Sequence, residues 1–187
     1  MSAHVDTAAD FRTAVEIGVD EINHLPGFVW AEGLTSDAYR LSQADAERAA
    51  SAGTVVVTTI GIALRLYPND PDGLQAVQAL QRENLQRLHA AGVRIAIGSD
   101  SPPDTSREEV AVLRKIGAFD DETLLRLWIE TARTTIFPKR RLGCLDVGCE
   151  ASFLVLRQNP IQDFGALDAI ELAIKEGVSV GKRPETE

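Results

Sequence analysis

Short apolar runs rich in β-branched residues alternate along this chain with longer amphipathic segments, and this alternation constrains its fold more than any other feature. The run Thr54–Thr59 lacks polar alternation, as expected of a strand that is buried on both faces. Shorter strands are predicted over residues 20–25 and 93–97, and a stub of strand over residues 1–3. Strands that alternate with helices pair in parallel through right-handed crossovers. The first part of the chain is therefore predicted to form an α/β domain.

Helices are predicted between these strands from apolar spacing and from capping residues. Thr7 is followed three positions later by Asp10, and Ser106 by Glu109, which is the spacing of a capping box at the start of a helix. Gly92 stands where a glycine commonly ends a helix. The predicted helices cover residues 7–17, 36–52 and 72–91, with two more beginning near residues 106 and 120.

The pattern changes after residue 137, where turns become frequent and the predicted segments shorten. Turn residues at Asn159-Pro160 and at Glu176-Gly177 separate short apolar or alternating runs. We therefore expect two domains, residues 1–137 and 138–187, of which the second is a small β-rich annex. Its strands are predicted over residues 152–156, 170–175 and 178–180.

Two architectures match the strand–helix alternation predicted for the first domain: a doubly wound sheet and a TIM barrel. No GxGxxG or GxxxxGK[ST] motif follows any predicted strand, which removes the usual nucleotide-binding argument for the doubly wound sheet. A whole TIM barrel takes ~250 residues, and only residues 1–137 precede the annex. A barrel in this chain would therefore be half of one.

The charge balance disfavours several classes of partner. The chain has 28 acidic and 19 basic side chains, a net charge of −9, and its Lys and Arg residues form no cluster, so nucleic acid and anionic membranes are not expected to bind. No stretch approaches the ~20 apolar residues of a membrane span. The start Met1–His4 lacks the basic residues and the apolar run of a signal peptide. We therefore expect a cytoplasmic protein.

The two cysteines, Cys144 and Cys149, are close enough in sequence to form one short bridge. However, C-x4-C with no further Cys or His nearby matches neither a zinc knuckle nor a redox CxxC motif. We expect both residues to be reduced thiols.

Three polar residues follow predicted strands, and the carboxyl ends of parallel strands are where active sites gather. His4 follows the first stub, His24 ends the second strand and Asp100 comes just after the fourth. Two imidazoles and a carboxylate form the three-ligand set of a catalytic Zn²⁺, which lowers the pKa of its bound water towards ~7. Asp100, beside that water, could also carry its proton to a leaving group.

Each of these residues also has an ordinary interpretation. A single histidine near a strand end is more often a hydrogen-bonded residue than a ligand, and an aspartate after Gly-Ser is a common cap. Together the three residues are better evidence for a metal site than any one of them alone, because two of only three histidines fall at strand ends. The third, His89, lies near the end of the long predicted helix. Other acidic residues near the strand ends are interpreted as caps or surface groups: Asp6, Asp20, Glu21 and Glu32.

Three segments of the chain, Ser2–Thr7, Ala14–His24 and Gly92–Ser101, resemble the metal-dependent amidohydrolase superfamily, in particular its imidazolonepropionase-like and prolidase-like branch. Residues 142–160 resemble the return of that branch into its small β-sandwich domain. The resemblance implies strands five to eight of a (β/α)8 barrel, with His4 and His24 as the metal-ligand histidines of strands five and six. Asp100 matches the aspartate of strand eight.

The resemblance also implies a chemistry. In this superfamily a metal-activated water, held by one or two divalent ions such as Zn²⁺, attacks the amide-like carbonyl of a small, cyclic or dipeptide substrate. Asp100 would bind metal and also act as the catalytic proton carrier. The expected activity is thus hydrolysis of carbon–nitrogen bonds.

Two departures from the superfamily pattern suggest that the chain matches only the carboxyl-terminal half of an amidohydrolase. It has no His-x-His pair, and no lysine at a strand end; the lysines are Lys115, Lys139, Lys175 and Lys182. A half barrel exposes strand edges, so we expect a partner: a complementing amino-terminal half or a second copy of this chain. The alternative function is a catalytically inert fragment or subunit that needs a partner chain for strands one to four.

Overall fold

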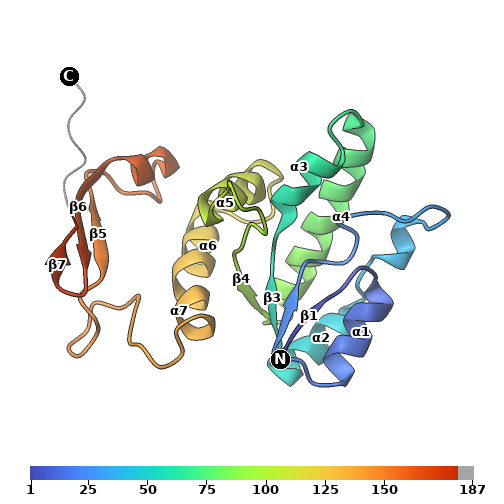
Figure 1. Ribbon diagram of the computed structural model, residues 1–187, viewed down its shortest axis with the longest axis horizontal. Helices are drawn as coiled ribbons and strands as arrows, with labels where there is room; N and C mark the ends of the chain where they lie inside the picture. The colour runs from blue at the N-terminus through green and yellow to red at the C-terminus, as the bar shows by residue number, and fades with distance from the viewer. Residues whose placement is uncertain (181–187) are drawn as a thin grey trace. The chain divides into compact units, whose positions relative to one another are not determined.

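The computed structural model describes residues 1–180, which fall into two compact units that divide between Asp120 and Asp121. This division lies earlier in the chain than the domain boundary expected after residue 137, which stays a prediction. Lys182 lies outside the described residues. Each unit is described by itself below (Figure 1).

The first unit contains a four-stranded parallel sheet whose spatial order follows the order of the chain, β1-β2-β3-β4. A doubly wound sheet reverses its strand order at a switch point. This sheet has no such reversal, and consecutive strands of a barrel have none either. The predicted α/β class is confirmed. The strands are β1 (Ser2–His4), β2 (Glu21–Asn23), β3 (Val55–Val57) and β4 (Arg94–Ala96).

Helices lie along one face of this sheet, where α2 (Gln43–Ala52) contacts both α1 (Ala8–Glu16) and α4 (Pro71–Ala90) (Figure 1). The strand side chains Ile22, Val56 and Ile95, which are paired in register, are fully buried in the core. The next row points to the other face and includes the exposed Ser2 and Arg94. A parallel sheet is normally covered on both faces. The exposure of Ser2 and Arg94 therefore shows that the second face of this sheet is partly open.

The helices predicted to begin near residues 7, 72 and 106 start close to those positions. Thr7 and Asp10 form the predicted capping box of the first helix. The long helix starts at the Asp70 cap, with a proline at its first turn. The segments are α1 (Ala8–Glu16), η1 (Ser36–Ala38), α2 (Gln43–Ala52), η2 (Ile60–Ile62), α3 (Ala63–Leu66), α4 (Pro71–Ala90) and α5 (Ser106–Lys115).

Two helix predictions need correction. The segment 36–52 is not one helix. Ser42 caps a separate helix that begins at Gln43, and the Leu41 amide before it donates to the side-chain oxygen of Asn84 on α4 instead of to a helical carbonyl. The capping box of α5 is formed by Thr105 and Glu108, one position earlier than predicted. That shift turns Glu109 away from the cap and into the core, where it is 1% exposed.

The second unit consists of short helical segments followed by a three-stranded antiparallel sheet of order β5-β6-β7. Its strands lie where the sequence predicts strands. Across residues 1–180, no helix has both the length and the apolar character needed to cross a membrane. The segments are α6 (Asp121–Arg126), η3 (Leu127–Thr131), α7 (Ala132–Thr135), β5 (Phe153–Leu156), η4 (Phe164–Asp168), β6 (Ile170–Lys175) and β7 (Val178–Ser179).

The cysteines of the second unit are joined in a disulfide, so the expectation of reduced thiols is wrong for this structure. The Cys149 amide donates to the Asp146 carbonyl and closes a tight turn. This turn brings the Cα atoms of Cys144 and Cys149 to 5.9 Å, within the range that a disulfide spans. The lack of a zinc-knuckle or redox CxxC motif in the sequence therefore did not exclude a disulfide bond between these cysteines.

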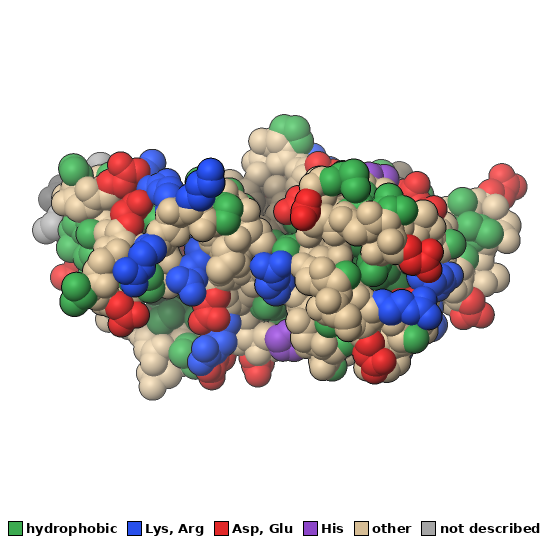
Figure 2. Space-filling view, turned by 90° about the horizontal axis from the view of Figure 1, so that it is seen from below, with side chains coloured by type: hydrophobic (Ala, Val, Ile, Leu, Met, Phe, Trp, Pro, Cys, Tyr) green, Lys and Arg blue, Asp and Glu red, His purple; other side chains and the backbone are tan. Residues whose placement is uncertain are grey.

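Charged groups of both signs are interspersed over the face of the molecule that Figure 2 shows. Charged side chains also pair across elements, as Arg12 on α1 does with the buried Asp45 on α2 at 3.1 Å. Such pairs tie neighbouring helices together, although partly exposed pairs contribute little to stability.

Candidate functional site

The structure brings together the three residues that the sequence singles out. His4, His24 and Asp100 line one pocket of about 450 Å³ at the carboxyl ends of the parallel strands. His4 is the last residue of β1, His24 directly follows β2, and Asp100 follows β4. The remaining lining residues come from the same strand ends: Asn23, Val57, Thr59 and Gly98.

The two imidazoles of this pocket lie close to each other, and each has a carboxylate beside it. The ring centroids of His4 and His24 are 4.6 Å apart, edge to face. Nε2 of His24 lies 3.4 Å from Oδ2 of Asp100, and Nε2 of His4 lies 3.1 Å from Oδ1 of Asp6. Asp6, interpreted from the sequence as a cap or surface group, therefore lies beside the candidate ligand His4.

His24 is held more tightly than its neighbours. It is 6% exposed, and its ring stacks on Phe28 with centroids 4.6 Å apart. Burial, and after it the neighbouring His4, lowers the pKa of His24 below its ordinary value of 6.5, while Asp100 and Asp6 oppose this shift. The ring is therefore neutral at neutral pH, the form that binds a metal.

Backbone strain is concentrated in this pocket. Among residues 1–180, four non-glycine residues have a positive φ: His24 (70°), Thr59 (53°), Asp100 (46°) and Glu176 (53°). The first three line the pocket, although they come from three different strand ends. A left-handed conformation costs an L-residue roughly 1–2 kcal/mol and persists mainly where the surroundings enforce it, which is common at functional sites.

Sequence reasoning missed two residues that contact the His24 ring. Thr59 contacts Nδ1 of His24 through its hydroxyl oxygen, at 2.6 Å. Phe28 stacks on the same ring. No local pattern marks either residue. Thr59 lies 35 residues from its partner His24 in the chain. Phe28 reaches the His24 ring only because the loop after β2 folds back.

The donor types in the pocket fit a divalent metal ion. Two histidines and an aspartate are a common ligand set for zinc, and the buried His24 points Nε2 towards Asp100. Within the described part of the chain, however, no three His, Cys, Asp or Glu side chains stand ready to hold a metal ion as placed. His4 instead contacts Asp6, and the side chains of His4 and Asp100 are 55% and 56% exposed.

The other residues considered from the sequence lie elsewhere. His89, which lies on α4, packs against Phe119, with ring centroids 5.2 Å apart. Among the described lysines, Lys115, Lys139 and Lys175 do not line the pocket.

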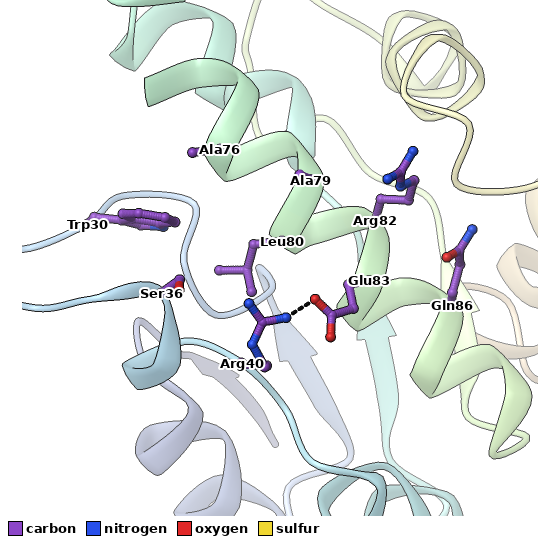
Figure 3. Close-up of a pocket in the computed structure, with 9 residues that line it drawn as sticks. All are labelled: Trp30, Ser36, Arg40, Ala76, Ala79, Leu80, Arg82, Glu83 and Gln86. Carbon is purple, nitrogen blue, oxygen red and sulfur yellow. Dashed lines mark ion pairs between the residues drawn. The ribbon is translucent and has the colours of Figure 1, made fainter. Parts of the chain in front are cut away.

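A second hollow of about 410 Å³ lies between α4 and the segment that follows β2 (Figure 3). Trp30 lies at one side of it, and Arg40 pairs with Glu83 across it. The described residues that line this hollow include no histidine or cysteine, and the one carboxylate among them is already paired with a guanidinium. The pocket around His24 is therefore the better candidate site.

No family model and no curated protein matches the chain. Solved structures do match over nearly all of it. They include a prolidase complexed with N-methylphosphonate-L-proline, with a TM-score of 0.70, 23% identity, and coverage of 97% of this chain and 45% of that one. An A. niger ochratoxinase matches with a TM-score of 0.77, 22% identity, and coverage of 98% and 42%. A Xaa-Pro dipeptidase with bound methionine matches with a TM-score of 0.69, 21% identity, and coverage of 97% and 44%.

This chain therefore spans less than half the length of each of these structures. At these levels of identity the comparison concerns the fold. The chain has the α/β fold found in part of the amidohydrolase and prolidase-like structures that it matches.

Proposed function

We propose that this chain carries the carboxyl-terminal half of a metal-dependent hydrolase, corresponding to barrel strands five to eight, that cleaves carbon–nitrogen bonds in amide-like, cyclic amide or dipeptide substrates. The meeting of His4, His24 and Asp100 in one pocket carries this proposal. The likeness to a prolidase and a Xaa-Pro dipeptidase supports the choice of bond.

The residues of the pocket have distinct roles in this proposal. His4, His24 and Asp100 would hold one or two divalent ions, of which zinc suits these ligands best. When bound, such an ion supplies a water that ionises near neutral pH. Asp100 would accept a proton from that water at a carboxylate oxygen and pass it to the departing nitrogen. His24 would offer a neutral ring nitrogen, because burial disfavours its charged form.

We propose that a partner completes this site and covers the open edges of the sheet. Among residues 1–180, β1 pairs only with β2 and β4 pairs only with β3, so both edges of the sheet are open in the described part of the chain. A complementing amino-terminal half or a second copy of this chain would pair with these edges and cover the open face. The missing ligands of a complete site would come from the same partner.

A second candidate function is a catalytically inert subunit. It is favoured by the lack of a His-x-His pair and by the lack of a ready metal-holding group within residues 1–180. Zinc binding separates the two candidates.

We expect the purified chain to bind Zn²⁺ at the pocket, measured by calorimetric titration and by metal analysis after gel filtration. His24→Ala should weaken binding by more than about 100-fold, because losing a ligand costs more than the roughly 10–100-fold effect of losing an outer-shell partner. His4→Ala should weaken it in the same direction.

His89→Ala is the matched control, because it removes an imidazole that packs on Phe119 outside the pocket. It should leave Zn²⁺ affinity unchanged. If the chain takes up no Zn²⁺, or if the His4 and His24 variants bind as the parent does, the ligand assignment fails and the inert subunit is the better description.

A further inference from the structure

We propose that Thr59 is a positioning residue that fixes the His24 ring with Nε2 presented to the pocket, and that Glu109 holds Thr59 in the conformation this requires. The inference rests on the proposed function for its purpose, which is to present a metal ligand. The contacts that carry it lie on three elements: the end of β2, the loop after β3, and α5.

The first contact joins Thr59 to His24. The hydroxyl oxygen of Thr59 lies 2.6 Å from Nδ1 of His24, and the two residues are 4% and 6% exposed. When Nδ1 carries the hydrogen and donates to this hydroxyl, Nε2 keeps its lone pair.

The position of Asp100 agrees with this tautomer. Nε2 of His24 and Oδ2 of Asp100 are 3.4 Å apart, which is longer than an ordinary N–H···O hydrogen bond. Nε2 therefore does not donate a hydrogen bond to the carboxylate. Its lone pair is available to bind a metal ion in the pocket.

The second step concerns the backbone of Thr59, which has φ 53° and ψ 33°. A β-branched residue rarely adopts this left-handed conformation, so other contacts must hold it. On one side, the Thr59 amide donates to the Gly98 carbonyl at 3.0 Å and extends the pairing of β3 with β4.

The third step is the contact with Glu109 on α5. The amides of Ile60 and Gly61, which directly follow Thr59, donate to Oε1 and Oε2 of Glu109, each at 2.7 Å. A buried carboxyl group is costly unless such hydrogen bonds satisfy it. A Cβ on Gly61 would lie 3.0 Å from Oε2, so glycine leaves room for this close approach. Glu109 thus fixes the two peptide groups that follow Thr59.

Ring ¹⁵N chemical shifts of His24 in the metal-free protein test the inference directly. They distinguish the two neutral tautomers at a pH where the ring is uncharged, and His24→Ala assigns the signals. We expect the parent to show the Nδ1–H tautomer. Thr59→Val keeps the shape and β-branching but removes the hydroxyl, and it should populate the Nε2–H tautomer.

Thr59→Ser is the matched control, because it keeps the hydroxyl and should keep the parent tautomer. Glu109→Gln tests the second part of the inference. It should change the His24 shifts in the direction of Thr59→Val, because the loop that carries Thr59 is no longer held at both amides.

Zn²⁺ affinity provides a second measurement. Thr59→Val should lower it by about 10–100-fold, the usual effect of losing the group that orients a metal-binding histidine. Thr59→Ser should stay within a few-fold of the parent.

The outcomes separate the two proposals. If Thr59→Val keeps the parent tautomer, Thr59 does not position the ring and the inference is wrong. If Glu109→Gln leaves the His24 shifts unchanged, Glu109 serves stability alone and its part of the inference is wrong. If Thr59→Val changes the tautomer but no form of the chain binds Zn²⁺, the positioning inference holds and the proposed function fails.

Discussion

Glu109→Ala is expected to lower the free energy of unfolding of the first unit by roughly 2–6 kcal/mol, because two amides lose their acceptor and each polar group left without a partner costs about 1–3 kcal/mol. The variant removes the acceptor of the Ile60 and Gly61 amides at once. Glu109→Gln keeps one acceptor oxygen and places an NH₂ group against the other amide, so its loss should be about 1–3 kcal/mol. Urea unfolding followed by circular dichroism measures both.

Glu16→Gln is the matched control for these variants, because Glu16 is an exposed residue at the end of α1. Its effect should stay within about 0.5 kcal/mol, as for most surface substitutions. A Glu109→Ala effect as small as that of the control would show that the two amides do not depend on this carboxyl group.

The contribution of Glu109 to stability should also depend on pH. Burial raises the pKa of Glu109 above its ordinary value of 4.5, although the Thr58 hydroxyl and the amides of Gly61 and Ile60 act against this shift. Between the unfolded and the folded pKa, the unfolded chain ionises while the folded chain resists ionisation. The stabilisation is therefore fully present below the unfolded pKa and falls as pH rises through the folded pKa.

The stability difference between the parent and Glu109→Gln should accordingly be larger near pH ~4.5 than near pH ~8. Other carboxyl groups titrate alike in both proteins and cancel in the difference. Urea unfolding of the pair at several pH values measures it, and a difference that grows with rising pH would contradict the raised pKa.

Gly27→Ala is the second substitution for which a large effect is expected. Gly27 has φ +85°, and a Cβ there would lie 2.8 Å from both Cδ2 of Leu80 and Cβ of Tyr39. The left-handed backbone costs an alanine roughly 1–2 kcal/mol, and overpacking adds about 1–3 kcal/mol. We therefore expect a loss of roughly 2–5 kcal/mol in the free energy of unfolding.

Gly53→Ala is the matched control, because Gly53 has a similar φ of +71° but no atom of residues 1–180 that would crowd the added Cβ within 4 Å. It should show only the backbone cost of roughly 1–2 kcal/mol. Equal losses for the two variants would mean that Leu80 and Tyr39 move aside. Because Phe28 follows Gly27 and stacks on His24, the His24 ring shifts report whether Gly27→Ala also disturbs the site.

The sequence by itself determined where the strands of the first unit run and which residues stand at their carboxyl ends. Apolar runs and helical spacing are local signals, and parallel strands bring their carboxyl ends to one edge whatever lies between them. His4, His24 and Asp100 could therefore be placed at a common edge before any coordinate was known. Their role as metal ligands stays a proposal.

Local patterns were less reliable where two residues competed for the same role. Thr105 and Ser106 can each cap a helix, and the choice between them changes the direction of every following side chain. One residue of slip turns a helical side chain by about 100°. The prediction that Glu109 closes the capping box was wrong for this reason, and its place in the core was missed.

Only the tertiary structure decided how the site is supported. Thr59 reaches His24 across 35 residues, and Glu109 reaches Ile60 and Gly61 across 49 and 48 residues. These contacts depend on how β2, β3 and α5 pack, which no local spacing encodes. The left-handed backbone at His24, Thr59 and Asp100 has the same origin, since those residue types rarely adopt it unless the surrounding packing enforces it.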